Sequence, residues 1–253
     1  IEDLDPPRCQ PGASEVIIEQ LQSHGLVPDS ISYQSQHLGR YQRALEQLIT
    51  LPNVYYCDCT RKEIVSRGGT EQGYCLSRQH QIDPNDAAIR VRLETQPNWN
   101  DLVQGQQQNS QSSTELILKR RDGLHAYPLA VVVDDIDLGA THIVRGYDLI
   151  DVAAGQIELY KLLNAPVPAF LHIPVAANRF EQKLSKQNKA PALDANDAIH
   201  HLQLALTHLN QPRNDQLKSV SDMLEFAVEH WRRDLIPSTQ SVPAPDHLSY
   251  QLE

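Results

Sequence analysis

An apolar helix followed closely by a buried strand constrains the fold of this chain more than any other feature. Residues 148–163 place apolar side chains on a core-facing side of a helix, from Ile150 through Ile157 to Leu163. Residues 170–175 then form a short apolar run that is typical of a buried strand. A lysine-bearing loop follows this strand. We therefore expect a helix and a strand that share a core, with a basic loop after the strand.

The rest of the chain carries weaker signals of the same kind. Residues 116–118 and 129–133 predict either two strands or a strand and a helix. Residues 104–114 are polar and of low complexity, which predicts a mobile loop. The stretch after Pro237 is expected to be poorly ordered. The other expected elements are helices at 14–24, 41–51, 199–209 and 223–231, and strands at 54–56 and 87–93.

The charge balance limits the partners of the chain. Its formal net charge is −10, which argues against indiscriminate binding to nucleic acid. A local basic face is compatible with this charge, and three clusters are candidates for it. Each cluster is equally well explained as solvated surface charge. The clusters are residues 119–121, residues 232–233, and the group Lys183, Lys186 and Lys189.

Length and composition are those of a globular protein, with 253 residues of which 40% are hydrophobic. No apolar run approaches the roughly 20 residues that a membrane-spanning helix needs, and no signal peptide is recognisable. The four cysteines suit a reducing compartment better than a disulfide scaffold. We therefore expect a cytoplasmic monomer that does not contact membranes. Because the chain opens on Ile1 rather than methionine, we expect it to begin partway into a longer gene product.

Three cysteines have a spacing that suits a metal. One residue separates Cys57 from Cys59, and Cys75 follows after residues 60–74. Two thiolates on a tight turn and a third from a returning segment are a reasonable arrangement for structural Zn²⁺. Three free thiols in a loop without metal are the alternative. Cys9 is isolated, and we expect no special role for it.

The loop after the buried strand reads KLSKQ at residues 183–187. Two lysines that flank a small hydroxyl residue supply mobile positive charge, which can close over a triphosphate and later release the product. An ordinary basic loop is the alternative. Three further segments decide between these interpretations. They are IEDLDPPR at residues 1–8, HAYPLAVVVDD at residues 125–135 and IVRGYDL at residues 143–149.

In this order and spacing, the four segments resemble the glutamyl branch of the class I aminoacyl-tRNA synthetases, and the resemblance covers most of the chain. It implies an α/β fold, with a Rossmann-type catalytic domain, a small zinc-binding insertion and a short helical C-terminal region. It also implies that the loop lysines Lys183 and Lys186 are catalytic, with Lys186 in direct contact with the phosphates of ATP. Mg²⁺ is expected to accompany ATP.

The resemblance assigns three further residues to the binding of L-glutamate. Glu2 and Tyr127 would face the ammonium group, and the Arg145 guanidinium would grip a carboxylate. Taken singly, they are also explained as a frayed terminal residue, a tyrosine at the edge of the core and a surface arginine. Four aspartates of the same segments either orient these groups or cap turns: Asp134, Asp135, Asp137 and Asp148.

Several details resemble a short subgroup of this branch that acts on queuosine. Only residues 188–253 follow the KLSKQ loop, which leaves no room for an anticodon-binding domain. Members of the subgroup carry Cys-x-Cys followed by Tyr-x-x-x-Cys, with the tyrosine as the fourth zinc ligand. This chain departs from that pattern, because Glu71 occupies the tyrosine position while Tyr74 adjoins Cys75. Glu71 is therefore the tentative fourth ligand, since Tyr74 and Cys75 are too close in sequence to share one ion.

The subgroup activates glutamate with ATP without needing tRNA, and then transfers it to the queuosine base at the wobble position of tRNA(Asp). We expect the same partners here: ATP, L-glutamate and tRNA(Asp) that carries queuosine. One alternative is a truncated glutamyl-tRNA synthetase that charges tRNA(Glu). The other is a catalytically silent paralogue that binds RNA or a protein.

The resemblance also predicts a division into parts. Residues 1–54 and 116–192 are expected to form the catalytic domain, residues 55–115 the zinc-bearing insertion, and residues 193–253 a helical region with a disordered tail. The family's HIGH-type segment, which carries half of the ATP site, is not found in the 253 residues. Either this segment precedes the 253 residues in the full protein or the chain is a fragment that lacks it, and we expect no adenylate formation without it.

Overall fold

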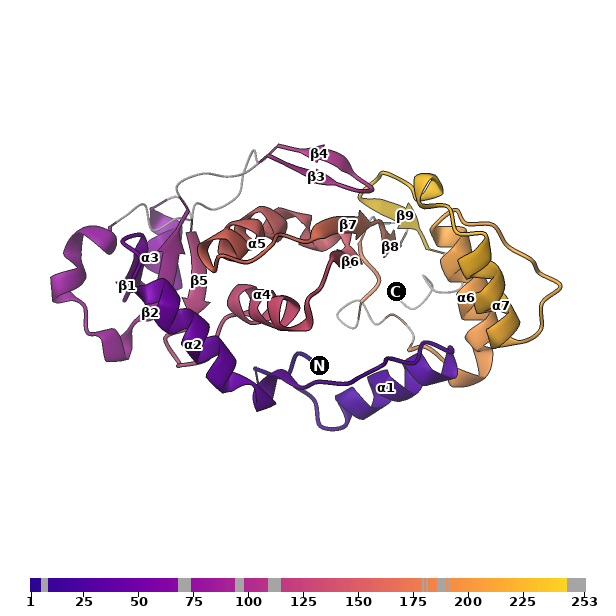
Figure 1. The fold of residues 1–253 in the computed structure, drawn as a ribbon, viewed down its shortest axis with the longest axis horizontal. Helices are drawn as coiled ribbons and strands as arrows, with labels where there is room; N and C mark the ends of the chain where they lie inside the picture. The colour runs from indigo at the N-terminus through magenta and orange to yellow at the C-terminus, as the bar shows by residue number, and fades with distance from the viewer. Residues whose placement is uncertain are drawn as a thin grey trace.

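The computed structural model describes residues 1–5, 9–67, 74–93, 98–108, 115–178, 180, 182–185, 190 and 192–244. The molecule is elongated, with a small sheet at one end, two buried helices and a mainly parallel sheet in the middle, and a helical pair at the other end (Figure 1). The helices are α1 (Ala13–Ser23), α2 (Leu38–Ile49), α3 (Arg61–Ser66), α4 (Tyr127–Leu138), α5 (Ile150–Leu162), α6 (Ala198–His208) and α7 (Val220–Glu229). The strands are β1 (Val54–Cys57), β2 (Ala88–Arg92), β3 (Trp99–Asp101), β4 (Gly105–Gln107), β5 (Glu115–Lys119), β6 (His142–Gly146), β7 (Ala169–Ile173), β8 (Val175–Ala177) and β9 (Ser241–Pro243).

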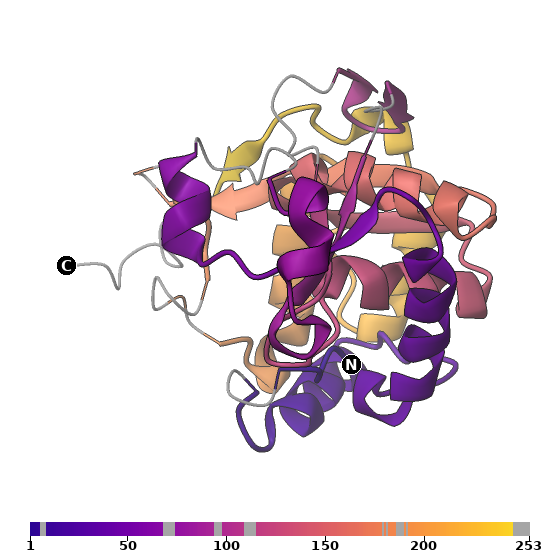
Figure 2. The same ribbon diagram turned by 90° about the vertical axis from the view of Figure 1, so that its left-hand side faces the viewer.

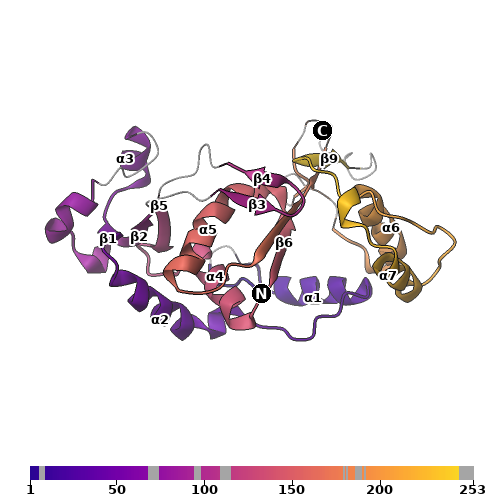
Figure 3. The ribbon, with the colours of Figure 1, turned by 45° about the horizontal axis from the view of Figure 1, so that its top comes forward.

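The central sheet has the strand order β4-β3-β7-β6 (Figure 3). β7 runs parallel to both β6 and β3, and α5 makes the crossover from β6 to β7. The register of β6 on β7 pairs Arg145 with His172, so a cationic and an imidazole side chain come from adjacent positions of neighbouring strands. This α/β arrangement agrees with the expected fold class.

The main core lies between α2, α4, α5 and the two sheets. Leu45, Leu118, Leu129 and Leu159 are each at most 1% exposed. A Cβ atom on Gly155 would lie 2.9 Å from Cδ1 of Leu116, so the absence of a side chain there lets α5 approach β5 closely. The other buried members of this core are Tyr41, Leu48, Ile89, Val91, Leu93, Ala130, Val132, Val133, Ala153, Ile157, Tyr160 and Phe170.

The small sheet has the order β1-β2-β5 and is antiparallel throughout. Figure 2 turns this end of the molecule toward the viewer. A second apolar cluster, of Tyr55, Cys57, Cys75, Ile82 and Ala87, lies against this sheet. The neighbouring helix α3 begins with a capping box. Thr60 Oγ1 accepts the amide of Glu63 at 3.3 Å, and Glu63 Oε2 accepts the amide of Thr60 at 2.7 Å.

Two expectations about irregular segments are wrong. Residues 105–107, placed in a mobile loop by their composition, form β4 and pair with β3. A tight turn explains this pairing: Gly105 adopts φ +74°, and Asp101 Oδ1 accepts the amides of Val103 and Gln104 at 2.9 and 2.8 Å. Residues 241–243 form β9 beside β8, although the stretch after Pro237 was expected to lack order. The parts of both segments at 109–114 and 245–253 lie outside the described residues.

The other expected elements occur within a few residues of their predicted bounds. Of the two alternatives for residues 116–118 and 129–133, the strand and helix pair is confirmed, as β5 and α4. The sheets cross the expected divisions of the chain. β3 and β4 come from residues 55–115 and join the central sheet, whereas β5 follows residue 114 and pairs with β2. In the part of the chain that is described, no helix combines the length and apolarity that crossing a bilayer requires.

We expect the core around β5 to dominate stability. Leu118 is fully buried, whereas Leu138 at the end of α4 is 70% exposed, which makes the two leucines a matched pair. Leu118→Ala should lower the free energy of unfolding by about 2–5 kcal/mol, because it removes buried apolar surface and leaves a cavity. Leu138→Ala should change it by less than about 0.5 kcal/mol. Urea unfolding of both variants measures the difference, and equal effects would contradict the described core.

Candidate functional site

Arg145 on β6 has a guanidinium that is held from several sides. Its Nε donates to Nε2 of His172 at 2.9 Å, and its Nη1 donates to Oε1 of Gln156 on α5 at 2.7 Å. The ring of Phe170 lies 5.3 Å from the guanidinium carbon. Both acceptors are neutral groups, so these contacts orient the cation without cancelling its charge.

Two donors in this region form no hydrogen bond of regular geometry among the described residues: Nη2 of Arg145 and Nε2 of Gln156, both buried. The hydroxyl of Tyr127 lies near both side chains, and its interaction with them opposes the rise in its own pKa. No described carboxylate forms an ion pair with Arg145 either. Burial lowers the pKa of the guanidinium, which measures the cost of withdrawing this charge from water. An incoming carboxylate would satisfy both donors and recover that cost.

Glu2 and Tyr127 lie close to this cation, as their pKa values indicate. Desolvation raises the pKa of Glu2, and the charges of Asp134 and Asp135 raise it further, while Arg145 lowers it. Desolvation also raises the pKa of Tyr127, which Glu2 raises further and Arg145 lowers. Three residues that are far apart in the sequence therefore share one electrostatic environment.

The aspartates of α4 have partners in the scaffold. Asp134 accepts hydrogen bonds from Gln34 Nε2 and from Tyr41 Oη, each at 2.8 Å. Asp135 accepts one from the hydroxyl of Tyr160 at 2.9 Å. Burial raises the pKa of Asp135, although the bond from Tyr160 opposes that effect. These contacts tie the helix to its neighbours and set the negative charge beside Glu2. The remaining aspartate of this helix, Asp137, pairs with Arg40 at 3.0 Å.

The lysine loop begins next to the same region. Lys183 pairs with Ala177 of β8 in an isolated bridge, and its Nζ lies 2.5 Å from Oδ2 of Asp148. Asp148 follows β6 by two residues, so this ion pair links the loop to the strand that carries Arg145. Lys186 lies outside the described residues.

A large cleft connects Glu2 and Tyr127 with the small sheet. Its volume is about 1140 Å³, and its far wall includes Cys59 and Arg61. Arginines contribute part of the lining, although two of them are already paired: Arg120 with Asp5 and Asp122, and Arg121 with Asp86. Arg90 also lines it.

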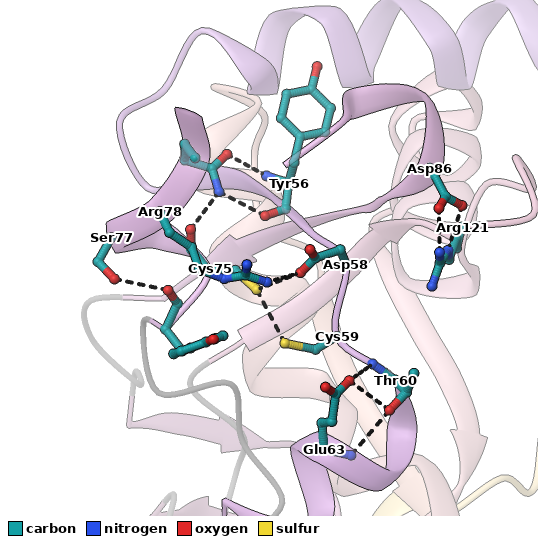
Figure 4. Close-up of polar contacts among 12 residues, drawn as sticks. Tyr56, Asp58, Cys59, Thr60, Glu63, Cys75, Ser77, Arg78, Asp86 and Arg121 are labelled. Atoms are coloured by element: carbon teal, nitrogen blue, oxygen red, sulfur yellow. Dashed lines mark hydrogen bonds and ion pairs between the residues drawn. The ribbon is translucent and has the colours of Figure 1, made fainter. Parts of the chain in front are cut away.

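The three predicted cysteines meet beside the small sheet. The sulfur atoms of Cys57, Cys59 and Cys75 all lie within 4.8 Å of one another, and those of Cys59 and Cys75 are 3.3 Å apart. Figure 4 shows the contact between Cys59 and Cys75. Thiolates bound to one zinc ion at ~2.3 Å lie about 4 Å from each other, so the cluster is compact enough to hold one ion. Burial raises the pKa of the Cys57 thiol.

Two arginines surround this cysteine cluster. Arg67 donates to Sγ of Cys59 at 3.1 Å, and Arg78 pairs with Asp58. Both guanidinium groups lie over the ring of Tyr74, at 4.0 and 4.6 Å from its centroid. The ring of Tyr74 is thus engaged by cations rather than directed at the sulfur atoms. Glu71 lies outside the described residues.

The structure adds residues that motif matching did not single out. Gln156 lies in the predicted helix at 148–163 without having been placed on its core face, and His172 lies in the predicted buried strand, yet both bind Arg145. A histidine inside an apolar run expected to be buried is the signal that could have indicated His172. Asp101 gave no such signal, because it lies in the insertion range, far from the motifs in sequence.

Comparison with known proteins agrees with this arrangement. Residues 1–208 match the sequence-family model for class I tRNA synthetases (E and Q), catalytic domain. The chain also superimposes on the glutamate-tRNA synthetase from Elizabethkingia anophelis with a TM-score of 0.76 at 20% identity. That alignment covers 98% of this chain and 61% of the solved one, so the likeness concerns the fold. The chain therefore belongs to the class I tRNA synthetases of the glutamate and glutamine branch, and its fold is that of their catalytic domain.

Curated relatives narrow the family further. The chain is 44% identical to the glutamyl-Q tRNA(Asp) synthetase of Pectobacterium atrosepticum, over 94% of the chain and 75% of the relative. It is 41% identical to that of Serratia proteamaculans, over 98% of the chain and 84% of the relative. It is 42% identical to the glutamyl-Q tRNA(Asp) synthetase of Escherichia coli K12, over 96% of the chain and 80% of the relative. The chain belongs to the glutamyl-Q tRNA(Asp) synthetase family.

The two tyrosines bonded to the α4 aspartates should resist ionisation in alkali. Burial and hydrogen bonding to Asp134 raise the pKa of Tyr41, and burial and the charge of Asp135 raise that of Tyr160. The native state therefore keeps protons that the unfolded state loses. The resulting stability is fully present below the ordinary tyrosine pKa of about 10 and is lost as pH rises through the raised values.

Tyrosinate absorbance measures this directly. In the unfolded protein, Tyr41→Phe and Tyr160→Phe should each remove the signal of one of nine tyrosines. In the native protein at a pH of about 10 to 11, neither substitution should change the signal. A native signal that falls in either variant would show that the hydroxyl titrates normally.

Proposed function

We propose that this chain forms the catalytic domain of an enzyme that activates L-glutamate with ATP and transfers it to the queuosine base at the wobble position of tRNA(Asp). The observation that carries the proposal is the guanidinium of Arg145. It is oriented by neutral acceptors, has no carboxylate partner among the described residues, and has one buried donor unused. The 40–44% identity to relatives named for this activity supports the choice of substrate.

The two ends of glutamate need different partners. Arg145 binds one carboxylate through Nη2, with Nε2 of Gln156 as a second donor beside it. Glu2 and Tyr127 offer the opposite character, a carboxylate and a hydroxyl near one another, which suits the ammonium group. The charged form of Glu2 is the one that binds an ammonium group. Burial, Asp134 and Asp135 raise the pKa of Glu2 overall, whereas the amino group of Ile1 and, to a smaller extent, Arg145 favour the charged form. Glutamate is then held in one orientation, with a carboxylate at Arg145 and its ammonium group at Glu2 and Tyr127.

Activation joins two anions, so cations near the reacting atoms stabilise the transition state. An oxygen of the glutamate α-carboxylate attacks the α-phosphorus of ATP, a P–O bond forms, and pyrophosphate leaves. Lys183 and Lys186 of the KLSKQ loop supply positive charge to the phosphates. Lys183 is held by Asp148 at 2.5 Å, so it must exchange that partner for phosphate when the loop closes. Mg²⁺, when bound with ATP, neutralises phosphate charge.

Transfer then uses a hydroxyl of the cyclopentene ring of queuosine as the nucleophile. Its oxygen attacks the glutamyl carbonyl carbon, the bond to the AMP phosphate breaks, and AMP leaves. The cleft of about 1140 Å³ that begins at Glu2 and Tyr127 gives the modified base a route to this carbon. The arginines in the lining of this cleft offer local positive charge to an anionic RNA backbone, despite the net charge of −10.

Charging assays with the full-length protein test this function. Radiolabelled glutamate should enter tRNA(Asp) that carries queuosine, and not tRNA(Asp) without queuosine or tRNA(Glu). Glutamate-dependent exchange of pyrophosphate into ATP should proceed without any tRNA. Charging of tRNA(Glu) instead would identify a truncated glutamyl-tRNA synthetase. Exchange and charging that are both absent would identify a silent paralogue.

We further propose that Cys57, Cys59 and Cys75 hold one structural zinc ion in the insertion at residues 55–115, with Glu71 as the fourth ligand. The compact sulfur cluster and the chemistry of three thiols fit Zn²⁺. The nearby Arg67 and Arg78 suit a site whose thiolates carry excess negative charge. When bound, the ion would link β1 to the segment that begins at residue 74, and it has no part in glutamate activation.

Metal analysis of the purified protein should therefore find about one zinc per chain. Cys59→Ser and Cys75→Ser should reduce the content severalfold or more, because each removes a thiolate ligand. Cys9→Ser is the matched control and should keep the full content, since Cys9 is exposed and outside the cluster. Glu71→Gln tests the fourth ligand, and an unchanged zinc content and affinity would exclude it. A protein purified without zinc that cannot be loaded with it would contradict the site.

A further inference from the structure

A buried aspartate and histidine lie directly behind Arg145. Asp101 and His172 are 1% and 0% exposed, and Oδ2 of Asp101 lies 2.6 Å from Nδ1 of His172. The ring of Trp99 meets the edge of the imidazole at a centroid distance of 5.7 Å, and Phe170 stacks on it at 6.3 Å. The pair is therefore sealed in the sheet, where it cannot itself contact a substrate.

The hydrogen bonds fix where the protons of this pair lie. Burial alone would raise the pKa of Asp101, but hydrogen bonds from His172 and from the amides of Gln104, Val103 and His172 lower it overall. The carboxylate is thus ionised at neutral pH and can only accept, so Nδ1 of His172 must carry a proton. Nε of Arg145 always carries a proton, so Nε2 of His172 must offer a lone pair to it. Asp101, His172 and Arg145 are therefore joined by two consecutive hydrogen bonds: Nε of Arg145 donates to Nε2 of His172, and Nδ1 of His172 donates to Asp101.

These hydrogen bonds determine the orientation of the Arg145 guanidinium. The planar guanidinium is held at Nε by His172 and at Nη1 by Gln156, which fixes its orientation. Nη2 is then the nitrogen that remains for a ligand. Asp101 is in turn fixed by the turn between β3 and β4, and Gln104 from the same turn donates to the carbonyl of His172 at 2.7 Å. The position of Arg145 thus depends on a hairpin that belongs to the insertion range.

We propose that Asp101 and His172 are positioning residues that set the tautomer and the hydrogen bond by which Arg145 recognises the substrate carboxylate. This inference rests on the proposed function for the identity of the substrate. The neutral imidazole is essential to it: a carboxylate at this position would pair with the guanidinium and cancel the charge that the substrate needs. The β3–β4 hairpin therefore contributes to glutamate affinity without touching glutamate.

Steady-state kinetics of pyrophosphate exchange in the full-length protein test the proposal. His172→Leu and Asp101→Asn should raise the KM for glutamate by about 10- to 100-fold, the usual effect of losing a partner behind a binding group, while the KM for ATP changes less than about twofold. His172→Gln should recover most of the affinity, because its Oε1 restores an acceptor for Nε of Arg145. His142→Leu, an exposed histidine on the same strand as Arg145, is the control and should match the wild type.

Two results would overturn the proposal. One is an unchanged KM for glutamate in His172→Leu. The other is a rise of similar size in the KM for glutamate and the KM for ATP, with His172→Gln no better than His172→Leu. That pattern indicates a purely structural role. Thermal unfolding of each variant accompanies the kinetics, and His172→Gln serves as the decisive variant if His172→Leu does not fold.

Nitrogen NMR of histidine-labelled protein provides a measurement that does not depend on activity. His172 should show a protonated Nδ1 and an unprotonated Nε2, and Asp101→Asn should change this pattern. Any other tautomer in the native protein would refute the proposed chain of hydrogen bonds. A wild-type protein without glutamate-dependent exchange would refute the proposed function alone, and the NMR result would then decide the positioning role.

Discussion

A largely buried guanidinium that forms no ion pair with a described carboxylate is the constraint on which the central part of this structure depends. Withdrawing the charge of Arg145 from water is costly, and neutral partners offset only part of that cost. Two neutral acceptors, His172 and Gln156, and the face of Phe170 hold the group, and they come from β7 and α5. The parallel register of β6 on β7 is what places Arg145 beside His172. The part of the desolvation cost that these neutral partners do not offset is the physical basis of the carboxylate binding that we propose.

The candidate site is built from segments that are distant along the chain. Glu2 comes from the first residues, Tyr127 begins α4, and Arg145 lies on β6, the first strand of the parallel β6–β7 pair. The aspartates of α4 are held by hydroxyl and amide donors from α2, α5 and the segment before α2, which keeps their charge beside Glu2. Each side chain is thus positioned by an element other than its own. This is a physical reason for strong coupling between folding and substrate binding here.

Residues 55–115, which the sequence predicted to be a separate insertion, contribute strands to the central sheet. Their hairpin of β3 and β4 continues the central sheet through β7, and Asp101 at the turn bonds to His172. At its other end the same range carries the cysteine cluster and lines the cleft that begins at Tyr127. One stretch of chain thereby contacts His172, the partner of Arg145, at one place and lines the cleft at another. Changes in the insertion can reach the site without altering any motif.

By itself, the sequence determined the family, the alternation of helix and strand, and the identity of the motif residues. These depend on local periodicity and on side-chain chemistry at fixed spacing, which are readable along the chain. The partners of Arg145 could not be derived in the same way, because Asp101 and His172 meet through strand register and a turn, and register depends on the pairing of distant segments. The β4 strand was missed for the same reason: a polar composition predicts a loop, while the turn at Gly105 and the capping by Asp101 supply the pairing. Only the tertiary structure decided which polar groups are buried together, since burial is a property of the packed chain and not of any one segment.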